Sequence, residues 1–231
     1  TLFAKICRTS KIIMQITKYV THSFQVQKLA MQEGWEPGAR YTNLRDIRRF
    51  ERLGFLDIDW QDYSFKLHLN AVKATQPHTT VARDIVDLSS LDKILHEAEE
   101  LSNYCERVVV VPKDIKLSNV MESAIPPKFA FGYSVPTKYG GTQIPTSQFR
   151  RKVHLLGGRP DVQRRLGEEL DVASLDCNRF TLDATFGDFF DGETFRPHPV
   201  GGYERCLVDS IRNINILWDG YLLNGDHLVR E

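Results

Sequence analysis

Short apolar runs recur along the chain and are separated by stretches with helical periodicity. Most of the runs are continuous rather than alternating, which is typical of strands covered on both faces of a parallel sheet. Six of them predict buried strands, at residues 54–60, 79–85, 107–114, 128–135, 152–158 and 172–177. Apolar positions at helical spacing predict helices over 64–75, 90–105, 159–170 and 203–220.

This alternation of strands and helices predicts βα units and hence a parallel sheet. Residues 2–7 and 11–17 are further candidate strands, and 24–34 has the pattern of a helix. Seven or eight such units in 231 residues predict an α/β fold of the TIM (β/α)8 type, as a single domain over 1–231. The segment 1–40 either completes the barrel or leaves it irregular and open. The competing open sheet, in its dinucleotide-binding form, would carry G-x-G-x-x-G after its first strand, and the chain has none.

Local signals place several element ends. Ser90 is a candidate N-cap, Pro160 suits a first helical position, and the helix over 203–220 stops at Gly220. The stretch 183–202 is long, aromatic and punctuated by Gly and Pro, which predicts a loop at the rim of the barrel.

The composition is that of an ordinary soluble protein, with 42% hydrophobic and 26% charged residues and a formal net charge of zero. A net charge of zero argues against a protein that coats nucleic acid without specificity, and it leaves room for local basic patches such as 45–52. The four cysteines form no C-x-x-C pair, so no zinc ribbon or redox motif is expected. Because they are scattered singly along the chain, we expect a reducing, cytoplasmic location. No apolar run approaches the length of a membrane span, so no membrane partner is expected. The sequence leaves the oligomeric state open, a homodimer included.

Carboxylates stand at or near the ends of several predicted strands. Sites of barrel enzymes lie at the carboxyl ends of the strands, so these acids would converge at one mouth if the barrel closes. The acids are Asp57, Asp59, Asp84, Asp114 and Asp176. Two carboxylates flanking a sugar can break a glycosidic bond, and a third can accept hydrogen bonds from the amino groups of a base. Gly132, Gly157 and Gly158 would allow the backbone to approach a flat ligand closely.

Metal and thiol chemistry fit less well. The seven histidines show no H-x-x-x-H or H-x-H pairing, and no cofactor or metal site is predicted. His154 lies inside an apolar strand, which favours a core histidine over a catalyst. Cys177, beside Asp176, is interpreted as a packing residue.

Five stretches of the chain, in order, resemble the tRNA-guanine transglycosylase superfamily. They are "GFLDIDWQDYSFKLHLNAVKATQPHTTVARDI", "RVVVVPKD", "FGYSVPTKYGG", "KVHLLGGRP" and "SLDCNRF". The resemblance covers roughly residues 40 to 220. It looks closest to the shorter, phage-type relatives that place 7-deazaguanine bases in DNA.

The resemblance implies a role for each matching residue. Asp176 matches the aspartate that attacks C1′ of the nucleoside, and Asp84 matches the acid that recognises the purine. Asp57 or Asp59 falls where the superfamily keeps its acid/base carboxylate, and the choice stays open. Gly132 and Tyr133 would line the base pocket with Gly157 and Gly158. Lys113, Arg159 and Arg179 are the candidate nucleic-acid contacts.

Departures from the superfamily pattern bear on the substrate. The chain lacks the C-x-C-x-x-C…H zinc site and the "DSGGFQ" signature of the tRNA enzymes, and Tyr133-Ser134 stand where a second glycine is usual. We therefore expect DNA, rather than tRNA, together with a 7-deazapurine base as partners. Two alternatives stay open. One is a glycosidase that excises the base with water. The other is a non-catalytic barrel, in which Arg83–Asp84 and Arg179–Asp176 form structural ion pairs.

Overall fold

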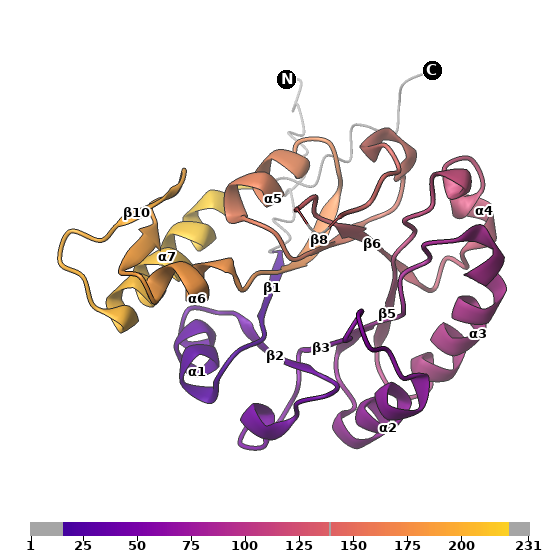
Figure 1. Cartoon of the computed structure of the whole chain (residues 1–231), viewed down its shortest axis with the longest axis horizontal. Coiled ribbons are helices and arrows are strands. Elements are labelled where there is room, and N and C mark those ends of the chain that lie inside the picture. Colours follow the sequence, from indigo (N-terminus) through magenta and orange to yellow (C-terminus); the bar gives the residue numbers. More distant parts are fainter. Residues whose placement is uncertain (1–15, 139, 222–231) are drawn as a thin grey trace, which may run out of the picture.

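Eight parallel strands form a closed barrel in chain order. The computed structural model describes residues 16–138 and 140–221. The first strand pairs with both the second and the eighth, which closes the sheet (Figure 1). The barrel strands are β1 (Thr17–Val20), β2 (Glu36–Arg40), β3 (Phe55–Asp57), β4 (Thr79–Val81), β5 (Arg107–Val110), β6 (Ala130–Ser134), β7 (Val153–Leu156) and β8 (Val172–Asp176). The predicted TIM-type fold is confirmed, and β1 and β2 complete the barrel rather than leave it open.

Helices surround the barrel (Figure 1). They are α1 (Phe24–Gln32), α2 (Phe65–Thr75), α3 (Leu91–Ser102), α4 (Met121–Ala124), α5 (Pro160–Leu166), α6 (Arg179–Ala184) and α7 (Tyr203–Trp218). Short 3-10 helices supplement them, namely η1 (Arg45–Ile47), η2 (Leu88–Ser90), η3 (Ile115–Leu117) and η4 (Thr146–Gln148). Within the described residues, only a 3-10 helix joins β2 to β3 and β6 to β7. The second of these connections contains Pro136, Gly140, Gly141 and Pro145, which disfavour a longer helix.

The six strands predicted from apolar runs all form, each shorter than its run. The N-terminal prediction was less accurate. Residues 2–7 lie outside the described residues, and the candidate strand 11–17 reaches them only at its end, where β1 starts. The strand β2, with the sequence EPGAR, was not predicted because Pro37 and Gly38 are rare inside strands.

A buried glutamine explains how β2 tolerates this sequence. Gln27 of α1 is 1% exposed, and its Oε1 accepts a hydrogen bond from the Gly38 amide at 3.1 Å. Its Nε2 donates to the carbonyl oxygen of His22. A Cβ at Gly38 would lie 2.4 Å from Oγ1 of Thr21, so only glycine fits this close approach of β1 and β2.

Aromatic rings fill the barrel interior below its mouth. The Tyr19 ring stacks on Phe55 with centroids 5.2 Å apart, and Phe55 lies 5.0 Å from the ring of His154. These residues come from β1, β3 and β7, in keeping with the layers of side chains from alternate strands that fill such barrels. The interior is therefore a packed core, and open space begins only at the strand ends.

The stretch 183–202 is not the plain rim loop that the sequence predicted. It contains a β-hairpin of β9 (Asp188–Phe190) and β10 (Phe195–Pro197), which packs beside α7 at the left of Figure 1. The Phe190 amide donates to Oγ of Ser210 on α7. Phenylalanines around an Asp191-Gly192 turn are a hairpin signal that the interpretation as a loop passed over.

The predicted helix ends agree with the structure in part. Pro160 is the first residue of α5, and α7 ends at Trp218, shortly before Gly220 with its φ of +70°. Ser90 occupies the N-cap position of α3, but its hydroxyl donates to the Asp87 carbonyl instead of capping the helix. Asp87 itself caps η2 by accepting from the Ser89 amide.

Candidate active site

A cavity of about 950 Å³ opens at the carboxyl ends of the barrel strands. Four of the five strand-end acids line it, namely Asp57, Asp84, Asp114 and Asp176, which come from β3, from the segments after β4 and β5, and from β8. These positions are far apart in the chain, and the closure of the sheet brings them to one mouth. The prediction that strand-end carboxylates converge is therefore correct for these four acids.

Asp176 is held by one of its two carboxylate oxygens. The residue is 6% exposed, and its Oδ1 accepts a hydrogen bond from the Gly157 amide at 2.9 Å. Nε2 of His154 lies 3.4 Å from the same oxygen. Gln163 donates to the carbonyl oxygens of both Asp176 and Gly157, which ties the end of β8 to the turn after β7. Within the described chain, Oδ2 of Asp176 has no hydrogen-bond partner and is available to a ligand.

Asp57 is the acid with the strongly altered ionisation. Burial, followed by the negative charge of Asp176, raises the pKa of Asp57 to about 7 from its ordinary value of 3.8. One hydrogen bond, from the Ile58 amide to Oδ1 at 2.8 Å, opposes this rise. Two carboxylates whose environments separate their protonation states are typical of acid/base pairs.

The structure also separates Asp57 from Asp59. Asp59 does not line the cavity. Its Oδ1 accepts from the Gln61 amide at 3.3 Å, and its Oδ2 lies 4.0 Å from Arg40. Of the two acids that the sequence could not distinguish, only Asp57 lines the cavity together with Asp176.

The raised pKa of Asp57 carries a cost in stability that depends on pH. The folded state binds a proton at Asp57 more tightly than the unfolded chain does. The contribution of this proton to the free energy of unfolding is therefore fully present below about pH 4 and decreases as the pH rises through 7. We expect Asp57→Asn, which keeps the oxygen that faces Ile58, to gain stability over the wild type. At about 1.4 kcal/mol per pKa unit, the rise from 3.8 to about 7 corresponds to about 4 kcal/mol at pH 8, and we expect a gain between about 1 kcal/mol and this upper limit.

Urea unfolding of both proteins at pH 4.5, 6 and 8 measures this effect. The stability difference should grow across the series, and the wild type at pH 4.5 serves as the internal reference. If the two proteins differ in their free energy of unfolding by the same amount at all three pH values, this would contradict the conclusion that Asp57 is neutral in the folded protein.

Asp84 faces the cavity in an ion pair. Its Oδ2 lies 2.7 Å from Nζ of Lys113, and both side chains are largely buried. Lys113 was predicted as a nucleic-acid contact, and it does line the cavity. The ion pairs expected for a non-catalytic barrel do not form, because Asp84 pairs with Lys113 and Arg179 pairs with Asp183.

The predicted base-binding glycines divide into two groups. Gly157 and Gly158 line the cavity, with φ of +62° and +89°. A Cβ at Gly158 would lie 2.4 Å from Val135 of the neighbouring segment, so the turn after β7 requires glycine there.

Gly132 and Tyr133 do not line the cavity, and this part of the prediction was wrong. A Cβ at Gly132 would meet the Val109 and Val111 side chains at 2.8 and 2.7 Å, so this glycine makes room for core packing. The Tyr133 ring contacts Phe149 instead. Successive residues of a strand point to opposite faces, and it is Ser134, the next inward position, that reaches the cavity.

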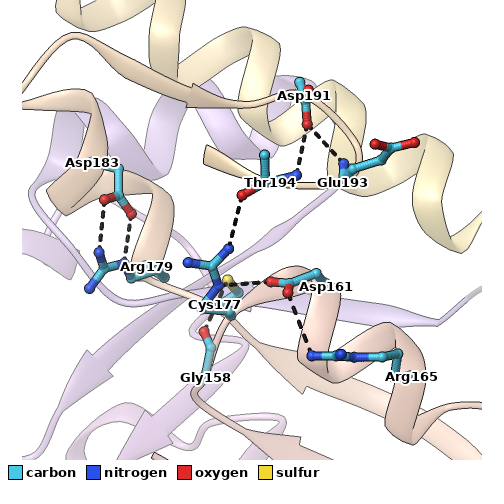
Figure 2. A network of polar contacts seen from close by, with 10 residues as sticks. Gly158, Asp161, Arg165, Cys177, Arg179, Asp183, Asp191, Glu193 and Thr194 are labelled. Carbon is cyan, nitrogen blue, oxygen red and sulfur yellow. Dashed lines mark hydrogen bonds and ion pairs between the residues drawn. The ribbon is translucent and has the colours of Figure 1, made fainter. Parts of the chain in front are cut away.

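Arg159 and Arg179 lie outside the cavity. Figure 2 shows Arg179 beside Asp183 in a network of polar contacts. Arg179 donates twice to Asp183, at 2.6 and 2.8 Å. Arg159 donates to Asp161 at 2.9 Å and to Thr194 of the hairpin at 3.3 Å. Arg159 joins the segment after β7 to the hairpin, and the Arg179–Asp183 pair lies within α6. A role of these two arginines in nucleic-acid binding stays a prediction.

Several cavity residues were missed as site residues by sequence reasoning. Arg40 ends the strand that the apolar pattern did not reveal, and Arg83 was considered only as a partner of Asp84. Asn178 lines the cavity, and its Oδ1 is held by the Thr21 amide at 2.8 Å. The signal that could have found Asn178 was its place directly after a strand end. Trp60, 59% exposed, stands at the rim as a surface for stacking.

Cys177 is a packing residue, as predicted. It is fully buried, and burial raises the pKa of its thiol to about 12. Among the described residues, no group of three His, Cys, Asp or Glu side chains is placed to hold a metal ion. No helix in the described part of the chain is long and apolar enough to cross a membrane.

A closed parallel barrel with an acid-lined cavity at the carboxyl ends of its strands defines the chain as a TIM-barrel protein. The chain belongs to a family of unknown function, DUF6610, which matches residues 30–219. No curated protein matches it. Among solved structures it is similar to the YdjI aldolase from Escherichia coli K12, with a TM-score of 0.54 and 9% identity over 92% of this chain and 93% of that one. This likeness shows a shared barrel fold.

Proposed function

We propose that the protein is an enzyme that breaks and re-forms the N-glycosidic bond of a guanine nucleoside unit, exchanging the base for a 7-deazaguanine derivative. The observation that carries the proposal is the pair formed by Asp57 and Asp176 at one cavity. Asp176 is held through Oδ1 and leaves Oδ2 without a partner in the described chain. The raised pKa of Asp57 leaves that acid able to carry a proton near neutral pH.

In the first step, Oδ2 of Asp176 attacks C1′ of the sugar. The bond between C1′ and the base nitrogen breaks, and its electron pair leaves with the base. Protonated Asp57 gives its proton to the departing purine, so the base leaves neutral. The products of the step are a glycosyl ester on Asp176, an ionised Asp57 and a free base.

In the second step, the incoming base attacks C1′ through its ring nitrogen. The proton of that nitrogen passes to the carboxylate of Asp57, and the ester bond to Asp176 breaks. Asp176 returns to the carboxylate form, and Asp57 is protonated for the next cycle. Two displacements at C1′ retain the configuration of the sugar, as expected for a nucleophile that forms a covalent intermediate.

Asp84 is the proposed contact for the purine. Its carboxylate accepts hydrogen bonds from N–H donors of a base, while Lys113 at 2.7 Å balances its charge. Stacking of the base on Trp60 would add apolar contact at the rim. The cavity lining contains the acids Asp57, Asp62, Asp84, Asp114 and Asp176 against the cations Arg40, Arg83 and Lys113. Such a mouth suits a donor-rich base better than a run of phosphates.

This surplus of acids also favours a second candidate, a nucleosidase that uses water in place of the incoming base. The basic residues expected to contact a nucleic acid are engaged in ion pairs, Lys113 with Asp84 and Arg179 with Asp183. A free nucleoside needs no such contacts. In this reaction, Asp57 would take a proton from water in the second step.

Product analysis of the wild-type protein tests the proposal. The protein is incubated with labelled guanine and either duplex DNA, single-stranded DNA or guanosine and deoxyguanosine, and products are separated by chromatography with mass detection. We expect label to enter the nucleic acid or nucleoside. Release of unlabelled guanine without incorporation would replace exchange by hydrolysis. Binding of DNA with neither product would overturn the proposal in favour of a non-catalytic barrel.

A further inference from the structure

His154 is a buried side chain with one nitrogen that lies close to the candidate nucleophile and forms no hydrogen bond in the described chain. The residue lies on β7, is 1% exposed, and its ring packs beside those of Tyr19 and Phe55. Nδ1 lies 2.9 Å from Oγ of Ser174. Nε2 lies 3.4 Å from Oδ1 of Asp176 and makes no other contact with a polar partner in the described chain.

The carboxylate decides which ring nitrogen carries the proton. With the proton on Nδ1, the lone pair of Nε2 would face a carboxylate oxygen, which is repulsive. With the proton on Nε2, an N–H dipole faces that oxygen, and Nδ1 accepts from the Ser174 hydroxyl. The second arrangement satisfies Nδ1, because the Ser174 hydroxyl has a hydrogen to donate, and it makes the 3.4 Å contact between Nε2 and the carboxylate oxygen attractive. The chain Ser174–His154–Asp176 is therefore polarised toward the carboxylate.

We propose that His154 is a positioning residue for Asp176, which together with the Gly157 amide holds Oδ1 so that Oδ2 is presented to the sugar carbon. The inference rests on the proposed function for its catalytic meaning. When the glycosyl ester breaks, the negative charge returns to the carboxylate that Nε2–H faces. A donor already in place at that moment costs no reorganisation. His154 touches neither the sugar nor the base and acts only through Asp176.

The ring nitrogens of His154 give a direct test that needs no activity. In ¹⁵N-labelled full-length protein, we expect His154 to show the Nε2–H tautomer at pH 7.5, with a low-field N–H proton signal that moves upfield in Asp176→Asn. His198 is a matched control, because its Nε2 lies 2.9 Å from Asp209 and its Nδ1 accepts from two backbone amides, remote from the cavity. Its signals should not move. An Nδ1–H tautomer, or signals of His154 that ignore Asp176→Asn, would refute the inference whatever the activity.

Kinetics separate positioning from mere packing. We expect His154→Phe, which keeps an aromatic ring in the core, to lower kcat about 10–100-fold with little change in KM. His154→Gln, whose amide can donate to Oδ1, should recover part of this loss, although it fills the core less well. His198→Gln serves as the control and should keep full kcat. If kcat of His154→Phe equals or exceeds kcat of His154→Gln, His154 has only a packing role. An absence of turnover in the wild-type protein itself would instead count against the proposed function.

Discussion

Replacing Asp176 with asparagine is expected to reduce base exchange by on the order of 10³-fold or more. The amide oxygen retains the shape of the carboxylate and can accept from the Gly157 amide, as Oδ1 does at 2.9 Å. It is a far weaker nucleophile, so the glycosyl ester does not form. The measurement is incorporation of labelled base into DNA or nucleoside, together with trapping of the protein–sugar ester by mass spectrometry.

Asp59→Asn is the matched control for this experiment. Asp59 is also an aspartate near a strand end, but it does not line the cavity. We expect Asp59→Asn to retain the exchange activity of the wild type. We expect Asp176→Asn to be folded, with a urea midpoint similar to that of the wild type. Full exchange by a folded Asp176→Asn variant would remove Asp176 from the chemistry. Equal losses in Asp59→Asn and Asp176→Asn would show that Asp59 takes part in the reaction although it lies outside the cavity.

The second large effect is expected for Asp57→Asn. A general acid and base contributes typically 10²–10⁴-fold, and we expect a loss of kcat in that range. The pH profile should change as well. The first step needs a protonated Asp57, whose pKa of about 7 predicts that kcat/KM of the wild type falls as pH rises above this value.

This fall at high pH should disappear in Asp57→Asn, because an amide does not titrate there. A substrate with a more acidic leaving base should be less affected by the substitution, since its departure needs less help from a proton. Rate profiles from pH 5 to 9 with guanine and 7-deazaguanine derivatives test both points. An unchanged fall near pH 7 in the variant would assign the titrating group elsewhere. The stability measurements on the same variant provide an independent check that it folds.

The barrel was predictable because burial on both faces leaves continuous apolar strands that local sequence displays. The strand β2 escaped the pattern since its backbone depends on Gln27, a residue on another element whose side chain satisfies the Gly38 amide. The hairpin at 188–197 was hidden in a stretch interpreted as a loop. Its turn residues were visible, but the α7 surface on which it rests was not.

The candidate site divides in a similar way. Acids at strand ends were visible in the sequence, and barrel closure was enough to bring Asp57, Asp84 and Asp176 together. The prediction that Gly132 and Tyr133 line the cavity was wrong because of the pleat of β6. Gly132 points into the packed interior, and Tyr133 points to the opposite face, where it contacts Phe149. The choice between Asp57 and Asp59 depended on where β3 ends, because Asp57 is its last residue and lines the cavity, whereas Asp59 lies two residues beyond it and does not.

The sequence by itself determined the class of fold and the acidic character of the barrel mouth, because both follow from the local order of apolar and charged residues. Only the tertiary structure decided which acids share the cavity, which arginines are already paired, and that His154 faces Oδ1 of Asp176. The physical reason is that burial and electrostatic coupling are properties of distances between residues far apart in the chain. The raised pKa of Asp57 and the single free oxygen of Asp176 exist only once β8 lies beside β1 and the barrel is closed.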